Sequence, residues 1–241
     1  MARITLIPET GSTNADLVAL VGQGWEEGHW LRAERQTAGR GRLGRAWQDG
    51  EGNLQASTLI RLRSGDPAVS GLGLLIGVAL HDALSGLAPD TGLSLKWPND
   101  LMAGYPGAGA KLAGILLERI GEAVIVGVGV NIARAPAVEG RLTAALADLP
   151  GGCDISVDTV MTALADSLDH WLARWRTEGF APLRDAWLAA AHPLGTRLAV
   201  HSGTESRVEG VFEGVAEDGA LLLRLEDGTR QVIHSGDVGF L

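Results

Sequence analysis

The sequence contains one cysteine and lacks both a hydrophobic leader and an apolar run of membrane-spanning length. Cys153 is the only cysteine in 241 residues, which excludes an intramolecular disulfide and a cysteine-ligated metal cluster and fits a reducing compartment. The first residues contain no apolar segment followed by a small-residue cleavage site, so no signal peptide is expected. The longest apolar stretch, from about Val69 to Leu80, is too short to cross a bilayer. We therefore expect a cytoplasmic protein that does not interact with membranes.

Basic residues are also scarce. Lys and Arg number 20 against 29 Asp and Glu, which gives a net charge of −9. This charge argues against a main role in non-specific nucleic-acid binding, which requires a basic surface. The remaining composition, 46% hydrophobic and 20% charged, is that of an ordinary globular chain with a sizeable core. The length fits one large domain, or one domain with a small appendage.

Strand-like and helix-like segments alternate through the first 191 residues. Alternating or continuous apolar patterns predict strands at residues 3–8, 29–36, 53–62, 93–97, 111–118 and 123–131. Helical spacing and end signals predict helices at residues 13–21, with Thr13 as the N-cap, and at 67–87, 156–177 and 182–191. The predicted fold class is α/β (α+β), with a mixed sheet flanked by helices.

The pattern changes after His192-Pro193. Short alternating strands follow, and they are broken by Asp218-Gly219 and Asp227-Gly228, which are both strong hairpin signals. A unit of this size is marginal alone, so we expect a small β-barrel that packs on the main domain. The predicted boundaries are 1–191 for the first domain and 192–241 for the second.

One segment concentrates positive charge in this acidic chain. Residues 39–45 read Gly-Arg-Gly-Arg-Leu-Gly-Arg, and we call residues 39–47 the arginine loop. Glycine lets the backbone approach a ligand closely, and each guanidinium between the glycines can be aimed at a carboxylate or phosphate. Alternatively, the segment is a solvated flexible loop or an RNA contact, although it lacks the aromatic residues that interleave in RNA-binding segments.

Two further segments place polar groups at strand ends. Lys96-Trp97-Pro98-Asn99-Asp100-Leu101 follows a predicted strand, and its proline fixes the turn that presents the Asn and Asp side chains. Lys111 heads an apolar strand that Gly114 interrupts, a position that often marks close approach of a ligand. An ordinary turn and a lysine that reaches out to water remain alternative interpretations.

The last two candidates are weaker alone. Residues 127–131 read Gly-Val-Gly-Val-Asn, and the two glycines leave open space in a predicted central strand that ends at Asn131. The segment is not a dinucleotide-binding fingerprint, because the third glycine is absent. Ser12, Thr13 and Asn14 lie at a helix start, where they either cap the helix or bind a polar heterocycle. The six histidines are scattered and none is paired at metal-ligand spacing.

The order and spacing of these segments together are specific. Segments 9–14, 36–47, 96–101, 111–117 and 126–131 resemble the biotin–protein ligase family, over about residues 5 to 135. The resemblance implies a catalytic domain like that of class II aminoacyl-tRNA synthetases, followed by a small SH3-like β-barrel. It also implies a two-step reaction in which biotin and MgATP form biotinyl-5′-AMP, and a lysine of a biotin carboxyl carrier protein then accepts biotin. The implied carrier is that of acetyl-CoA carboxylase or another biotin-dependent carboxylase.

The resemblance also implies residue roles. The expected catalytic residues are Lys111, Arg40 and Arg42. The expected biotin-binding residues are Ser12, Thr13, Asn14, Gln36, Gly39, Arg40, Gly41, Arg42, Lys111 and Gly114. The expected ATP- and Mg²⁺-binding residues are Arg45, Trp47, Lys96, Asn99, Asp100 and Asn131. The metal is expected to be held through ATP, without a protein metal cluster.

Two departures from the family pattern affect these expectations. Only eleven residues precede Ser12, which leaves no room for the N-terminal DNA-binding domain of members that also act as repressors. We therefore expect no operator binding. Related chains often carry an ATP-side arginine near the C-terminus, but this chain ends Asp237-Val238-Gly239-Phe240-Leu241. The oligomeric state is open, and an exposed sheet edge would support a homodimer.

Two alternatives belong to other classes. A lipoate or octanoate ligase or transferase of the same superfamily would usually carry an Arg-Arg…Gly-Gly-Gly loop and a His-Asp pair, and this sequence has neither. A non-enzymatic RNA-binding protein would use the arginine loop alone, and the acidic total charge argues against it.

Overall fold

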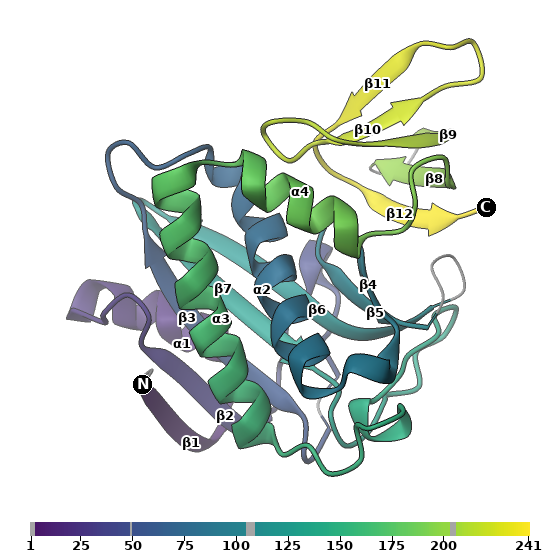
Figure 1. Ribbon diagram of the computed structural model, residues 1–241. Helices are drawn as coiled ribbons and strands as arrows, with labels where there is room; N and C mark the ends of the chain where they lie inside the picture. The colour runs from purple at the N-terminus through teal and green to yellow at the C-terminus, as the bar shows by residue number, and fades with distance from the viewer. Residues whose placement is uncertain (1–2, 49, 105–108, 203–205) are drawn as a thin grey trace.

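The computed structural model describes residues 3–48, 50–104, 109–202 and 206–241, and its strands form two sheets (Figure 1). The larger sheet has seven strands: β1 Ile4–Thr10, β2 Trp30–Gln36, β3 Leu54–Arg61, β4 Leu93–Lys96, β5 Asp100–Ala103, β6 Ala110–Ile120 and β7 Ala123–Val130. The main helices are α1 Thr13–Leu20, α2 Leu72–Leu87, α3 Val157–Glu178 and α4 Ala181–Ala190. The predicted fold class is confirmed.

The large sheet is mixed, in the order β1-β2-β3-β7-β6-β5-β4. Only β1 and β2 pair in parallel among the described strands, and all other neighbours are antiparallel. The prediction missed β5, because its four residues directly follow the turn at Pro98, which has a cis peptide bond. The tight turn folds β5 back onto β4, so that Lys96 pairs with Asp100 in the register.

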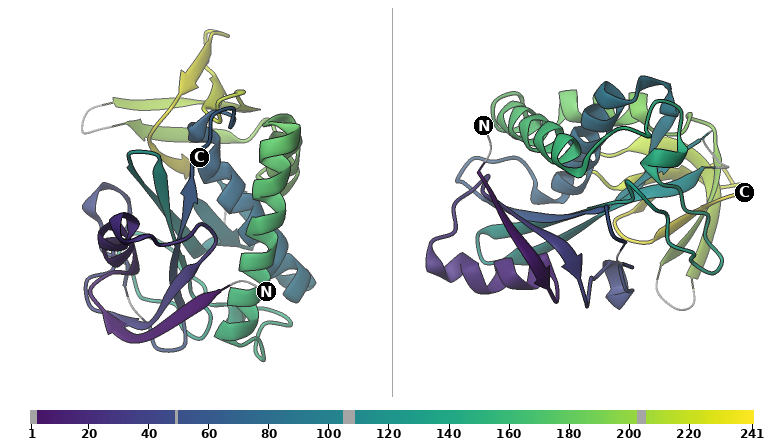
Figure 2. Two further views of the ribbon diagram at one scale, coloured as in Figure 1. Left: turned by 90° about the vertical axis from the view of Figure 1, so that its left-hand side faces the viewer. Right: turned by 90° about the horizontal axis from the view of Figure 1, so that it is seen from below.

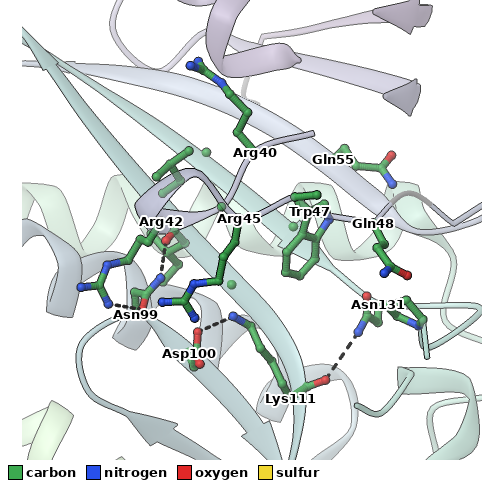
Figure 3. A pocket seen from close by; sticks show the side chains of 18 of the residues that line it. Arg40, Arg42, Arg45, Trp47, Gln48, Gln55, Asn99, Asp100, Lys111 and Asn131 are labelled. Atoms are coloured by element: carbon green, nitrogen blue, oxygen red, sulfur yellow. Dashed lines mark hydrogen bonds and ion pairs between the residues drawn. The ribbon is translucent and has the colours of Figure 1, made fainter. Parts of the chain in front are cut away.

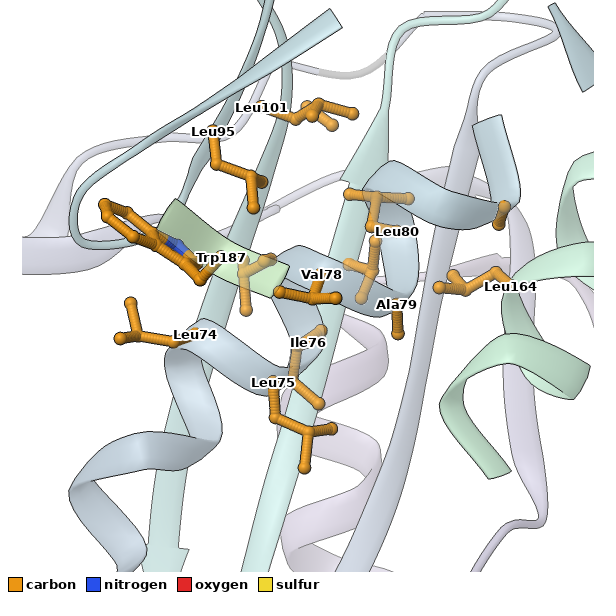
Figure 4. Close-up of a cluster of buried hydrophobic side chains, with 14 of the residues drawn as sticks. Leu74, Leu75, Ile76, Val78, Ala79, Leu80, Leu95, Leu101, Leu164 and Trp187 are labelled. Carbon is orange, nitrogen blue, oxygen red and sulfur yellow. The ribbon is translucent and has the colours of Figure 1, made fainter. Parts of the chain in front are cut away.

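Helices cover both faces of this sheet. Figures 1 and 2 show α2, α3 and α4 on one face and α1 on the other. The large core lies under α2, where its apolar side chains meet those of the sheet, α3 and α4 (Figure 4). A smaller cluster of Leu17, Leu31 and Ile125 lies under α1. Residues of β7 belong to both apolar clusters, which explains why the strand consists of apolar residues and glycine.

Helix α2 is longer than the apolar run seen in the sequence. With a preceding 3₁₀ turn it spans 19 residues, Val69–Leu87, and by length and composition alone it could cross a membrane. However, 61% of its most apolar window is buried inside the protein. Its buried residues contact the sheet and the other helices, so we interpret it as the core helix of the fold.

The start of α1 differs from the prediction. The N-cap is Ser12, with extended backbone angles, whereas Thr13 is the first helical residue. The side chain of Ser12 makes no capping hydrogen bond, and that of Thr13 bonds Gln36 and Ser57 on the sheet. The expected capping residue was therefore wrong by one position, because tertiary partners engage the Thr13 hydroxyl.

The C-terminal segment forms a five-stranded antiparallel sheet in the order β11-β10-β9-β8-β12. Its strands are β8 Arg197–Ser202, β9 Ser206–Val215, β10 Leu221–Arg224, β11 Arg230–Ile233 and β12 Asp237–Phe240. Both predicted hairpins are present, between β9 and β10 and between β10 and β11. The sheet packs on the main domain through Phe212, whose ring contacts Trp187 of α4 and His192 of the segment that follows α4. The domain boundary between residues 191 and 192 stays a prediction.

Candidate active site

A cavity of about 500 Å³ opens on the α1 face of the large sheet. Strands β6 and β7 form its floor, the arginine loop forms a wall, and Asp237 reaches its rim from the C-terminal sheet. Most of the predicted site residues line it: Ser12, Thr13, Asn14, Gln36, Arg40, Gly41, Arg42, Arg45, Trp47, Asn99, Asp100, Lys111, Gly114 and Asn131. Segments that are far apart in the sequence therefore meet around one cavity.

Gly39 and Lys96 do not line the cavity. Gly39 is the first residue of the arginine loop, and a Cβ atom there would come within 2.7 Å of the Trp47 carbonyl oxygen and 3.0 Å of the Gln36 side chain. Lys96 ends β4, and its ammonium lies 5.7 Å from the Phe240 ring centroid. Burial lowers the pKa of the Lys96 ammonium, an effect that Asp100 opposes.

One end of the cavity is a buried network of neutral hydrogen-bonding groups. The Gln36 Oε1 atom accepts from the Thr13 backbone N–H at 2.8 Å and from the Thr13 hydroxyl at 3.0 Å. The Ser57 hydroxyl lies 2.7 Å from that of Thr13 and donates to Asn14 Oδ1 at 2.6 Å. Ser57 is fully buried and Asn14 is 3% exposed. We call this cluster of Thr13, Asn14, Gln36 and Ser57 the head network.

Three glycines form the floor between the two ends. Gly127 and Gly129 of β7 share one face of the strand with the position of Asn131, and Gly114 of β6 pairs with Gly129. Same-face positions along a strand are spaced about 7 Å apart. A Cβ atom on Gly127 would come within 2.3 Å of Asn14 Oδ1, and one on Gly129 within 2.4 Å of the Trp47 indole. The glycines therefore let side chains lie directly on the sheet.

The opposite end is charged. Lys111 Nζ donates to Asp100 Oδ1 at 2.5 Å, and both side chains are only 12% exposed. Arg42 donates to Asn99 Oδ1 at 3.1 Å and lies 3.9 Å from Asp237 (Figure 3). Burial lowers the pKa of the Arg42 guanidinium, while Asp237 and Asp100 act to raise it. Two cations are thus held beside two carboxylates, in a position to meet an anionic ligand.

The arginine loop is a short hairpin. Arg40 and Ala46 form an isolated antiparallel bridge, and the backbone N–H of Gly41 donates to the Arg45 carbonyl at 2.7 Å. At the tip, Leu43 adopts φ 56° and is 78% exposed. Figure 3 shows Arg42 and Arg45 directed toward Asn99 and Asp100.

Arg40 points the other way. Its guanidinium donates to Glu118 at 3.2 Å, away from the charged end (Figure 3). The three arginines of the loop therefore have two different orientations.

Sequence reasoning missed several polar residues of the site. Ser57 lies in an apolar strand and reads as ordinary alternation, whereas Glu118 reads as the polar end of a strand. Asp237 forms an ion pair with Arg45, although 192 positions separate the two residues. No local pattern in the sequence signals such long-range contacts.

Asn131 directly follows β7 and lines the cavity. Its amide Nδ2 donates to the carbonyl of Ala144 at 3.1 Å, while its Oδ1 is buried without a hydrogen-bond partner among the described residues. That oxygen is thus a free acceptor. No group of three or more His, Cys, Asp or Glu side chains suited to a metal occurs in the described part of the chain.

Comparison with known proteins places this site in a class. Residues 7–131 match the model of the biotin/lipoate A/B protein ligase family, and residues 200–241 match that of the biotin protein ligase C-terminal domain. The chain therefore belongs to the biotin/lipoate A/B protein ligase family.

Full-length relatives narrow the class to the biotin protein ligases. The chain is 40% identical to a biotin–[acetyl-CoA-carboxylase] ligase of Paracoccus denitrificans, over 98% of this chain and 99% of that protein. It is 33% identical to the ligase of the same name from Mycobacterium tuberculosis, over 98% and 88%. A solved structure of the biotin protein ligase from Aquifex aeolicus in complex with biotin and ATP superposes with a TM-score of 0.84 at 26% identity, and the match covers 100% of this chain and 99% of that one.

Proposed function

We propose that this protein activates biotin with ATP to biotinyl-5′-AMP and transfers the biotinyl group to a lysine of a biotin carboxyl carrier protein. The observation that carries the proposal is the division of one cavity into a neutral hydrogen-bonding end and a charged end, with a glycine floor between them. A ligand that combines a polar uncharged ring, an aliphatic chain and a carboxylate fits that order. The lipoate alternative is less well supported, because a dithiolane ring offers no comparable hydrogen-bonding groups to the head network.

The head network would bind the ureido ring of biotin. Urea-like groups both donate and accept, as do the hydroxyl and amide groups of Thr13, Asn14 and Ser57. The valeryl chain would then run toward Lys111 past Asn14 and Trp47, the side chains that lie directly on Gly127 and Gly129. This arrangement places the biotin carboxylate at the charged end.

In the first step, a carboxylate oxygen of biotin attacks the α-phosphorus of ATP, and the bond from that phosphorus to the bridging oxygen breaks to release pyrophosphate. Lys111 and Arg42 would stabilise the negative charge that develops on the α-phosphate. Such electrostatic stabilisation is usually the largest single contribution to an enzyme's rate enhancement. Holding both reactants in one cavity supplies the remaining rate enhancement, so no protein nucleophile is needed.

Mg²⁺ belongs to this proposal as the partner of the ATP phosphates. The donor set fits an oxygen-preferring cation, because Asp100 offers a carboxylate and Asn131 offers a buried, unpartnered Oδ1. When bound, the ion would neutralise phosphate charge and assist departure of pyrophosphate. Asn99 and Asn131 would orient the nucleotide, while Arg45 and Trp47 would cover it.

In the second step, the neutral amine of a carrier lysine attacks the acyl carbon of the mixed anhydride. The acyl C–O bond breaks, AMP leaves, and the amine loses a proton as the amide forms. Water would compete for the same carbon, so the arginine loop and Trp47 must shield the adenylate until the carrier arrives. We propose the carrier domain of acetyl-CoA carboxylase, or of another biotin-dependent carboxylase, as the acceptor.

A cytoplasmic location and a homodimer are further parts of the proposal. Strand β1 is an edge of the large sheet and exposes Ile4 and Leu6, which are 38% and 50% exposed. Such an edge supports pairing with a second copy. Sedimentation of the free and ligand-bound protein would measure this association.

Thermal unfolding gives a direct test of ligand choice. A ligand that binds only the folded protein at 100 times its Kd adds about 2.7 kcal/mol of stability. For a chain of this length that corresponds to a rise in Tm of about 5–10 °C. We expect biotin plus MgATP to give that rise above the Tm with MgATP alone, lipoate plus MgATP to give no rise above MgATP alone, and RNA to give none. A comparable rise with lipoate would contradict the proposal.

A further inference from the structure

Glu118 lies between the head network and the arginine loop, and none of the roles assigned above uses it. Its carboxylate oxygen Oε2 accepts from Asn14 Nδ2 at 2.8 Å and from Arg40 at 3.2 Å. One oxygen atom therefore serves both a buried amide of the neutral end and a cation of the loop. The side chain of Glu118 is 29% exposed and that of Arg40 is 46% exposed.

The position of Asn14 depends on this contact. Its Oδ1 accepts from Ser57 and its Nδ2 donates to Glu118, while Gly127 lies directly beneath it. Asn14 is 3% exposed, so its two partners fix which way the amide faces. A carboxylate only accepts hydrogen bonds, which forces Nδ2 toward β6 and leaves Oδ1 with the head network.

Arg40 is held away from the reaction by the same carboxylate. Arg42 and Arg45 of the loop are directed toward Asn99 and Asp100 (Figure 3), whereas Arg40 donates to Glu118. A half-exposed ion pair of this kind is weak, so an anion in the cavity can compete for the guanidinium.

We propose that Glu118 is a positioning residue that links the two ends of the site: it orients Asn14 for the ligand ring and retains Arg40 until the anionic adenylate draws Arg40 away. The inference rests on the proposed biotin ligase function. It makes the closure of the arginine loop an exchange of partners, in which Arg40 leaves one carboxylate for the phosphate of the product. No covalent step is assigned to Glu118.

Two substitutions separate the two contacts. Glu118→Gln keeps an oxygen that accepts from Asn14 but removes the charge that retains Arg40. Glu118→Ala removes both contacts. Glu122→Gln is the matched control, since Glu122 is an exposed carboxylate four residues further along the same hairpin. Equal Tm values for all variants would show that the fold is retained.

The first measurement is the dissociation rate of biotinyl-5′-AMP from the full-length protein. We expect Glu118→Gln to slow it about two- to fivefold, because Arg40 no longer leaves its anionic ligand for Glu118. Glu122→Gln should match the wild type. A rate for Glu118→Gln that equals the control, or that is faster, would overturn the retaining role.

The second measurement is the affinity for biotin methyl ester, which keeps the ring and carries no charge. We expect Glu118→Gln to bind it as the wild type does and Glu118→Ala to bind it about three- to tenfold more weakly, the size of one lost hydrogen bond. Equal affinity for all three proteins would overturn the orienting role. Failure of the wild type to form any adenylate from biotin and ATP would instead refute the proposed function, so the two failures are distinguishable.

Discussion

Lys111 and Asp100 form a close ion pair across β6 and β5, with 2.5 Å between Nζ and Oδ1 and with 12% of each side chain exposed. Lys111 heads the strand that forms the cavity floor, and Asp100 follows the turn at Pro98. The pair joins two segments that looked like separate candidates in the sequence. Asp100 also fixes the direction of the Lys111 ammonium at the charged end. Stabilising the charge that develops when the carboxylate attacks the phosphate requires such a preorganised cation.

Lys111→Ala should reduce the rate of adenylate formation about 100- to 1000-fold, because one preorganised cation near the developing charge is lost. The KM for biotin should change much less, since the head network is untouched. Pyrophosphate release under saturating biotin and ATP measures this effect. Arg119→Ala, which removes an exposed cation from the same strand, is the control and should retain wild-type activity. Wild-type activity in Lys111→Ala would refute the assignment.

Arg42→Ala should release the adenylate about 10- to 100-fold faster, as expected for loss of one or two sheltered, charge-assisted hydrogen bonds. The free protein should stay folded, because the Arg42 side chain is partly exposed and lies beside Asp237 at the rim of the cavity. The rate of loss of bound biotinyl-5′-AMP, followed in a chase with unlabelled ligand, gives the measurement. Arg35→Ala removes an exposed arginine outside the cavity and should leave that rate unchanged. An equal rate in both variants would contradict the account.

Gly129→Ala should displace Trp47, because the added methyl group would lie 2.4 Å from the indole. Trp47 is the side chain that must give way, so adenylate retention should fall about tenfold or more while the fold survives. Gly86→Ala is a control in α2 with open space around the new methyl group, and it should raise stability by about 0.5–1 kcal/mol. Ligand retention with Gly129→Ala at the wild-type level would show that the glycine floor is not required.

His192 predicts a pH dependence of stability. It is 1% exposed between Phe212 and Phe240, and burial lowers its pKa to about 4 from 6.5. The unfolded chain therefore binds this proton more readily, and stability should be fully present above pH 6.5 and fall as pH drops toward 4. The loss attributable to His192 is on the order of 3 kcal/mol at the acid end.

The comparison with His192→Phe isolates this effect. Phe keeps an aromatic ring between Phe212 and Phe240 and cannot be protonated. Denaturant unfolding between pH 4 and 7 should show a steeper loss of stability in the wild type than in the variant. Parallel curves would mean that His192 is not the titrating group.

The fold could be predicted where pattern and length agreed. The alternation of residues 53–62 and the apolar run of 123–131 correspond to β3 and β7, and the hairpin signals at Asp218-Gly219 and Asp227-Gly228 correspond to turns of the C-terminal sheet. Strand β5 was missed, since four residues after a turn carry too little periodicity.

The candidate site was predictable in part, for a physical reason. The arginine loop stands out because its positive charges are clustered in an acidic chain, and Lys111 stands out because it precedes an apolar strand. Ser57, Glu118 and Asp237 act through contacts that only the folded chain creates, such as the ion pair of Asp237 with Arg45. The opposite directions of Arg40 and Arg42 likewise depend on those partners.

The most direct test of the proposed function is to detect the labelled adenylate that the protein forms from ATP. The protein is incubated with α-labelled ATP, Mg²⁺ and either biotin or lipoate, and the products are separated. Biotinyl-5′-AMP should form with biotin alone, and a purified carrier domain added afterwards should acquire biotin on one lysine while AMP is released. Adenylate formation only with lipoate, or no adenylate with either acid, would contradict the account.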